Sequence, residues 1–473
     1  MAFLVRISRG VTTWHLIFRS NILRLKIISV GILIITLCVG LNAQQGGVNS
    51  PFSRFGIGDL EPETPMHARQ MGGLGTAFIE TYHLNFDNPA SLAHLQATAF
   101  NLGMEFKNSR ITEGDQSSSN WSGNMSNLSL GFPLRNPKSQ QFSREAYKFN
   151  MGMGFAVMPN STTSYDITRR DASPNVGEFE RNFSGEGGTW KAMWSNSIKF
   201  GDLSFGANLG VLFGNIEYNR NILFTEEFSA YQNFFSNSYR LTSFYGKLGA
   251  MYLLQLNKDD VLESKGRVAP RLISFGLTYK PQVNFSTTSD ANELNIYPLP
   301  LDGSVLSGPA VDTLNVSTGV RGSGTLPGEI GFGAMYYGAN KFGLGIDYRY
   351  SNWSAYRNEA NPETLDDTYR IALGGYFRPD YQDLNNFLKR MSYRFGVYFE
   401  QDPRLINDTR ISTTAVTFGM GMPLAWQRRF SNFDIGVTFG KRSVEEVLSE
   451  NFAKITFGFT FNESDWFIKR KFN

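Results

Sequence analysis

The stretch from Leu326 to Tyr356 constrains the fold more than any other part of the sequence. On both sides of a turn at Ala339-Asn340, apolar and aromatic residues occupy every second position. Alternate residues of a β-strand point to opposite faces, so one face is oily and the other carries glycines and charges. Each half runs for about ten residues, the length with which a tilted strand crosses a bilayer, and aromatic residues gather near the ends. The stretch predicts a transmembrane hairpin, although a soluble sandwich with its oily face inward shows the same alternation.

The composition favours the membrane interpretation. The chain has 473 residues with 40 Phe, 20 Tyr and 47 Gly, an aromatic and glycine-rich profile, yet only 41% are hydrophobic and the mean hydropathy is −0.26. A barrel whose lipid-facing and lumen-facing residues alternate has this low average hydropathy. The formal net charge of +3 is small for the length, so we expect no nucleic-acid partner.

The N-terminal region predicts export. Arg24 and Lys26 precede an apolar run, 27–41, that ends in Leu41-Asn42-Ala43. A basic region, an apolar core and a small residue are typical of a secretory signal, so we assign residues 1–43 to a leader and signal peptide. Cys38, the one cysteine, lies in this run. The mature chain is then free of cysteine, which excludes disulfides and thiol chemistry.

The rest of the chain predicts an all-β fold, a transmembrane barrel of fourteen antiparallel strands at 96–462. Long polar connections are expected after the odd-numbered strands and mostly short turns after the even-numbered ones, which is the asymmetry of outer-membrane barrels. Residues 463–473 form a basic tail expected in the periplasm. The fourteen alternating segments are 97–107, 124–132, 148–158, 189–200, 203–214, 240–255, 271–284, 328–338, 341–352, 368–377, 391–400, 412–422, 432–440 and 453–462.

Residues 44–95 differ from the barrel. Four prolines interrupt any long regular element, and the stretch 68–78 is rich in glycine and other small residues. Such a stretch suits a segment threaded through a confined space, where backbones approach closely. We interpret 44–95 as an N-terminal hatch, or plug, inside the barrel lumen; the alternative is a periplasmic arm.

Two motifs resemble a known family. The glycine-rich stretch 68–77 followed by Asn88-Pro89-Ala90 is similar to the hatch of the FadL/TodX-type outer-membrane transporters of hydrophobic compounds. The hairpin opening at Leu326-Pro327 and closing at Trp353-Ser354 is similar to that family's Leu-Pro, Phe-Gly, Trp-Ser hairpin. The segment 50–56 and the basic tail resemble Bacteroidota versions of these barrels. The resemblance implies a hatch that gates passive uptake, with Gly72, Gly73, Gly75, Asn88, Pro89 and Ala90 as hatch and gate residues.

Two further sets of residues are candidates for the site. The possible ligand-lining residues are Phe78, Leu84 and Phe86 in the hatch and Phe224, Phe228, Phe234 and Phe235 in the expected outer loops. The alternative role of the hatch residues is packing against the barrel wall. The alternative role of the loop residues is an aromatic girdle at the membrane surface. The lumen charges are Asp347, Arg349, Arg370, Arg394 and Glu400. One interpretation is a structural network, because unpaired charges in a confined site are costly. The other is that one arginine binds the carboxylate of a ligand.

Enzyme chemistry has little support. After the signal the histidines are His67, His83 and His94, none with the spacing of a zinc motif. We therefore expect no catalytic residues, metal or cofactor. The sequence favours an outer-membrane protein for passive uptake of hydrophobic compounds such as long-chain fatty acids, in contact with outer-membrane lipid. The alternative is a barrel subunit of a type IX secretion or outer-membrane protein assembly complex, which binds protein partners.

Overall fold

The computed structural model describes residues 50–135, 148–174, 177–224, 232–264, 268–296, 311–339, 341–383, 385–406, 408–426, 429–444 and 448–463. The predicted leader and signal peptide, the first residues of the hatch, Asn340 and the tail after Glu463 lie outside these ranges.

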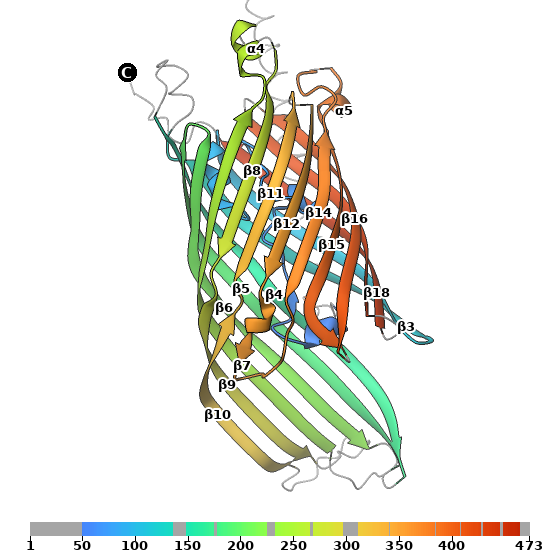
Figure 1. The fold of residues 1–473 in the computed structure, drawn as a ribbon. Helices are drawn as coiled ribbons and strands as arrows, with labels where there is room; N and C mark the ends of the chain where they lie inside the picture. The colour runs from blue at the N-terminus through green and yellow to red at the C-terminus, as the bar shows by residue number, and fades with distance from the viewer. Residues whose placement is uncertain are drawn as a thin grey trace, which may run out of the picture. The chain divides into compact units, whose positions relative to one another are not determined.

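A single antiparallel sheet closes on itself to form a barrel (Figure 1). Its strands are β2 (Thr98–Glu113), β3 (Gln116–Pro133), β4 (Asn150–Ser173), β5 (Gly177–Phe200), β6 (Leu203–Phe224), β7 (Gln232–Gln255), β8 (Arg271–Lys280), β9 (Val283–Ile296), β10 (Val311–Leu326), β11 (Glu329–Gly338), β12 (Phe342–Ser351), β14 (Thr368–Phe377), β15 (Ser392–Ile406), β16 (Thr409–Trp426), β17 (Arg429–Val444) and β18 (Leu448–Glu463). β9 continues β8 and β10 leads into β11, so the wall has 14 strands, as predicted. β18 pairs with β2 from Glu463↔Thr98 to Ser449↔Thr112 and closes the barrel.

The remaining elements are short. They are the two-residue strands β1 (Asp59–Leu60) and β13 (Arg357–Asn358), the 3-10 helices η1 (Pro51–Arg54), η2 (Pro89–His94) and η3 (Trp353–Ala355), and the α-helices α2 (Met66–Arg69), α4 (Lys258–Glu263) and α5 (Phe387–Arg390). No helix in the described part of the chain has the length and apolar character needed to cross a membrane.

The expectation of long outer loops was wrong for most connections. Residues 159–173, 177–188, 215–224, 232–239, 285–296 and 311–326 are strand, and β2 and β3 are joined by residues 114–115 alone. Antiparallel strands remain paired through their backbones once they leave the apolar layer, so a ladder continues where apolar alternation has ended. Alternation therefore found every strand but marked only its more apolar portion.

Six strands extend one side of the barrel far beyond the other. β4, β5 and β7 have 24 residues each, whereas β8, β11, β12 and β14 have 10. Pro281 and Pro327, which cannot donate to a ladder, separate β8 from β9 and β10 from β11. We call the distal parts of β4–β7, β9 and β10 the extension. It projects from the end opposite to α4 and α5 (Figure 1).

The barrel carries its apolar residues outside. On β11 and β12, Phe332, Leu344 and Ile346 are 49%, 49% and 46% exposed. Asp347, between Ile346 and Tyr348, is 7% exposed and faces inward. Charged and polar side chains on other strands are buried in the same way, as Lys247 on β7 and Thr417 on β16 are. An apolar outer surface around a polar interior is the arrangement of a membrane barrel and excludes the soluble sandwich.

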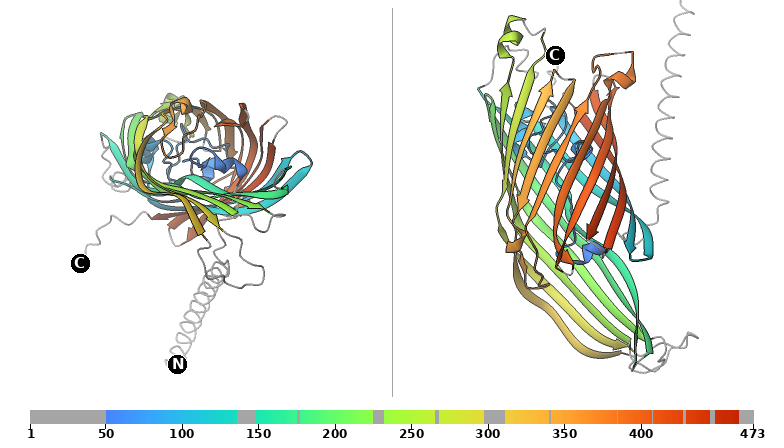
Figure 2. Two further views of the ribbon diagram at one scale, coloured as in Figure 1. Left: turned by 90° about the horizontal axis from the view of Figure 1, so that it is seen from below. Right: turned by 45° about the vertical axis from the view of Figure 1, so that its right-hand side comes forward.

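Residues from Ser50 to Leu95 lie within the ring of strands (Figure 2, left). Their apolar side chains form the packed interior together with the wall. Leu84, Phe86 and Leu92 pack against Ala156 and Met193 of the wall. A second cluster joins hatch residues 68–78 to β11 and β14. The lumen is therefore filled by a hatch, which excludes the periplasmic arm for the described residues.

Candidate functional site: the hatch and the β3–β4 seam

Inward-facing glycines of the wall let the hatch backbone touch the strands. A Cβ on Gly276 of β8 would lie 1.9 Å from the Thr76 carbonyl oxygen, and one on Gly374 of β14 would lie 2.4 Å from that of Met71. On the other side of the barrel, a Cβ on Gly152 of β4 would lie 2.0 Å from the Leu92 carbonyl oxygen. Side chains at these wall positions would displace the hatch.

The predicted hatch glycines contact the wall directly. Gly72 and Gly73 have φ values of +70° and +82°, which L side chains rarely adopt. The Gly72 amide donates to Thr417 Oγ1 at 2.9 Å, and the Gly75 amide donates to Asp347 Oδ2 at 2.7 Å. The glycine stretch thus exposes its backbone donors to acceptors on the strands.

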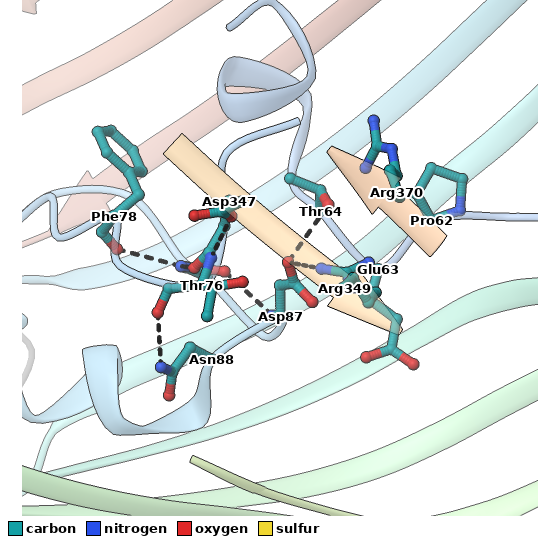
Figure 3. Close-up of polar contacts among 12 residues, drawn as sticks. Pro62, Glu63, Thr64, Thr76, Phe78, Asp87, Asn88, Asp347, Arg349 and Arg370 are labelled. Carbon is teal, nitrogen blue, oxygen red and sulfur yellow. Dashed lines mark hydrogen bonds and ion pairs between the residues drawn. The ribbon is translucent and has the colours of Figure 1, made fainter. Parts of the chain in front are cut away.

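The Asn88-Pro89-Ala90 motif starts helix η2 and ties two parts of the hatch together. Asn88 Oδ1 accepts from the Ala90 amide at 3.1 Å, so this side chain caps the helix, while Pro89 occupies its first position. Asn88 Nδ2 donates to the Thr76 carbonyl at 2.7 Å (Figure 3). All of Asn88 is buried. The motif therefore has a structural role, and the gating role remains a proposal.

A buried ionic network joins acids of the hatch to bases of the wall. Asp87 accepts from Lys247 Nζ at 2.7 Å. It also accepts from Arg349 Nη2 at 2.6 Å (Figure 3). Glu63 accepts from Lys191 at 2.7 Å and from Lys247 at 3.0 Å. Burial by itself raises the pKa of Asp87, but the facing Arg349 and Lys247 outweigh it and lower this pKa to about 2. The hatch is held by charges that would be costly to separate.

The five predicted lumen charges are brought together only in part. Asp347, Arg349, Arg370 and Arg394 contact the hatch, with Arg370 donating to the Gly72 carbonyl at 2.9 Å and Arg394 to Gln70 Oε1 at 3.0 Å. Glu400 lies 3.4 Å from Arg370, but its side chain is 47% exposed and touches no hatch residue in the described contacts. The structural network is therefore present.

The sequence prediction omitted several members of this network. Lys191, Lys247 and Asp434 are buried inward residues of β5, β7 and β17, and the alternation that identified Asp347 also places them in the lumen. Glu63 and Asp87, the hatch partners of the two lysines, had no local signal, because their role depends on which wall residues face them.

The predicted ligand-lining residues lie in different places. Leu84 and Phe86 are packed against the wall, whereas Phe78 lines a cavity of about 660 Å³ next to Glu80 and Tyr82. Phe224, Phe234 and Phe235 lie on β6 and β7 in the extension and are half-buried. Phe228 lies outside the described residues.

The wall is open between β3 and β4. The two strands pair only from Leu128↔Val157 to Pro133↔Gly152, although β4 continues to Ser173. The pairing of β4 with β5 has a register shift between Pro159 and Ser161 at this level, an irregularity of the kind that locally disrupts a ladder. The hatch strand β1 occupies the gap, pairing Asp59↔Thr162 and Leu60↔Ser161. We call this gap the seam.

Cavities follow one another across the seam. An outer depression of about 360 Å³ is lined by Met125, Trp190 and Phe213. Asn124 and Thr162 separate it from a cavity of about 40 Å³, whose lining also includes Leu60 of β1. Leu60 also lines a central cavity of about 200 Å³, which several paired bases and Trp353 surround. The outer face and the lumen are therefore separated at this point by β1 and a few wall side chains.

The comparisons with known proteins identify the family. The sequence model of the family described as BamG matches residues 25–473. The chain belongs to the BamG family. No curated protein matches the sequence of this BamG-family barrel.

Solved structures share its fold. The Pseudomonas putida toluene transporter TodX has a TM-score of 0.53 and 14% identity, covering 87% of this chain and 100% of its own. The CymD monoaromatic hydrocarbon channel has a TM-score of 0.51 and 15% identity, and the Ralstonia pickettii toluene transporter TbuX has 0.50 and 13%; each covers 86% of this chain and 99% of its own. The FadL/TodX-type resemblance is thus confirmed for the fold.

Proposed function

We propose that the chain is an outer-membrane channel for the passive uptake of hydrophobic compounds such as long-chain fatty acids. In this mechanism the solute enters from the extension into the central cavity and leaves sideways into the membrane through the seam. The hatch strand β1 acts as the gate. The series of cavities across the seam carries this proposal, because it needs only β1 to move.

The chemistry of the cavities supports an amphiphilic solute. The central cavity places Arg370 and Arg442 beside Trp353 and Tyr369, so an acid head group and an apolar tail would each have partners there. The outer depression, lined by Met125, Trp190 and Phe213, supports an apolar exit. The likeness to hydrocarbon channels concerns the fold alone and names no solute for this chain.

A disulfide across the gate tests the mechanism. Leu60 and Ser161 are Cα partners of an antiparallel pair, where Cα atoms lie about 4.5–5.5 Å apart, within the range of a disulfide. Leu60→Cys/Ser161→Cys would be reconstituted in liposomes and the uptake of palmitate, toluene and glucose measured. We expect oxidation to block the two hydrophobic solutes and reduction to restore them.

A matched pair provides the control. Thr168 and Asn182 are partners between β4 and β5 in the extension, where no separation is needed. Thr168→Cys/Asn182→Cys should transport equally in both redox states. Uptake that persists through the oxidised Leu60–Ser161 lock would contradict a route through the seam.

A second candidate function is a subunit of a secretion or outer-membrane protein assembly complex. The observation that favours it is the edge of the extension: Ser164 of β4 still bonds Ser50 and Ser53 of the hatch, but beyond it the β-ladder of β4 in the described residues is with β5 alone. A free strand edge can accept a strand from another protein. Affinity purification from native membranes decides between the two. Asp166→Pro removes a backbone donor from this edge, because the N–H of Asp166 points to the same side as that of Ser164. Stable large partners that are lost with Asp166→Pro would favour assembly over transport.

A further inference from the structure

Three metal-binding side chains meet between the hatch and the wall. His67 lies on α2, His83 follows in the hatch chain, and Asp434 faces inward from β17. One ligand atom from each lies within 4.8 Å of the others. His67 and Asp434 are 1% exposed and His83 is 5% exposed. This cluster is outside the ionic network of Asp87 and has no part in the proposed transport route.

The ligand atoms of His67 have no partner in the described part of the chain, and those of His83 and Asp434 face each other only at ion-pair distance. Neither ring nitrogen of His67 has a hydrogen-bond partner among the described residues, and the same holds for Asp434 Oδ2. Buried polar atoms are nearly always paired, and an unpaired one costs free energy. The two unpaired nitrogens of His67, beside the ion pair of His83 and Asp434, therefore point toward a missing partner.

The surrounding groups orient the three side chains as second-sphere groups do at metal sites. Asp434 Oδ1 is engaged by Arg394, which leaves Oδ2 directed at His83 Nε2, 3.4 Å away. The other ring nitrogen, Nδ1, faces Glu80 Oε2 at 3.3 Å. A metal-binding histidine characteristically turns its second nitrogen to a carboxylate, which fixes its orientation.

His67 is enclosed between the hatch and the wall and is 1% exposed. Its ring packs against Phe78 and His83, with centroids 5.4 and 4.4 Å away. The contacts of His83 with Glu80 and Asp434 account for His83 but leave both nitrogens of His67 without a partner among the described residues.

We propose that His67, His83 and Asp434 form a site for a divalent transition metal of the zinc class, which clamps the hatch to β17. Two imidazoles and one carboxylate are a ligand set that zinc accepts, with a further position for water. The geometry needs a small inward movement of the three side chains. Glu80, whose Oε2 faces His83, also lines the 660 Å³ cavity, which gives the ion a route of access. The inference is independent of the transported solute.

Metal titration of the full-length purified protein tests the site. The protein is treated with chelator in detergent, and Zn²⁺ binding is measured by calorimetry and Co²⁺ binding by its visible absorption. We expect one ion per chain with a tetrahedral Co²⁺ spectrum. His67→Gln and Asp434→Asn should each lose saturable binding. Glu80→Gln should bind about 10- to 100-fold more weakly, the usual effect of removing a second-sphere carboxylate.

His94→Gln is the matched control. His94 is the other hatch histidine, and its Nε2 lies 3.2 Å from Ser204 Oγ, away from the cluster. It should bind metal as the wild type does. Glu80→Gln keeps the test valid if His67→Gln fails to fold, because it leaves all three ligands in place. A wild-type protein without saturable binding, or His67→Gln and Asp434→Asn variants that bind like the wild type, would overturn the proposal.

Discussion

Single charged residues hold the hatch in place. Asp87 is fully buried and lies between Lys247 and Arg349. Removing one member of a buried ion pair leaves the other charge uncompensated and costs about 3–5 kcal/mol. The free energy that holds the hatch in the lumen therefore depends on a few carboxylates. We expect the stability of the barrel wall itself not to depend on them.

We expect Asp87→Asn to destabilise the seated hatch by about 3–5 kcal/mol while the barrel stays folded. Hydrogen exchange of the hatch amides and resistance of residues 50–95 to protease are the measurements. Asp171→Asn is the control, because its pair with Arg181 lies at the surface of the extension, with side chains 21% and 35% exposed, and should change little. Equal effects of the two substitutions would show that the network does not hold the hatch.

The same carboxylate predicts a pH dependence. The folded-state pKa of Asp87 is about 2, below its ordinary value of 3.8. The folded form therefore binds fewer protons, and its stabilisation is complete above pH 3.8 and is lost as the pH falls toward 2. Hatch protection in hydrogen exchange should persist at pH 5 and decrease below pH 4, with a smaller decrease in Asp87→Asn. Loss of protection between pH 7 and 5 would contradict this assignment.

At the scale of elements, contact between hatch and wall depends on strands without side chains at chosen positions. Gly249 on β7 shows this directly: a Cβ there would lie 2.1 Å from Asn88 Oδ1 and 2.8 Å from Pro89 Cδ. Neither atom can withdraw easily, because Asn88 caps η2 and the Pro89 ring is rigid. The Asn-Pro-Ala motif and the wall glycine are therefore in close contact, and each position depends on the other.

Gly249→Ala should destabilise the hatch by about 1–3 kcal/mol, the cost of overpacking an interior. The measurement is thermal unfolding together with protease resistance of the hatch. Gly246→Ala on the same strand is the control, since a Cβ there would meet only the Phe244 side chain, at 3.1 Å, and we expect little change. A neutral Gly249→Ala would mean that the hatch can shift without cost.

At the scale of the whole molecule, two environments surround one continuous sheet. The wall outside the extension exposes apolar residues such as Phe418 on β16, 52% exposed, to what we infer to be lipid. The extension exposes residues such as Val320, 50% exposed, beyond the β10–β11 break. A charge introduced at these two positions should therefore change the stability of the barrel by different amounts, although the two side chains are about equally exposed.

Phe418→Arg should destabilise the barrel in bilayers by about 2–4 kcal/mol if it lies near the midplane, because the guanidinium would enter hydrocarbon. Val320→Arg should be nearly neutral, because water surrounds that face. Reversible unfolding from liposomes measures both. Matching values for the two variants would place the membrane elsewhere on the wall.

The sequence alone determined the class of fold, the strand number and the inward or outward direction of side chains, because a period of two is a local property of the backbone. It also located the hatch glycines and Asn88, whose turn and cap are local. Only the tertiary structure decided how far β4–β7 extend, where the seam lies and which hatch acids meet Lys191, Lys247 and Arg349. The meeting of His67 and His83 with Asp434 was equally hidden. The contacts of Lys191, Lys247 and Arg349 with the hatch acids join residues 128 or more positions apart, and closure of the barrel, which no local pattern encodes, brings them together.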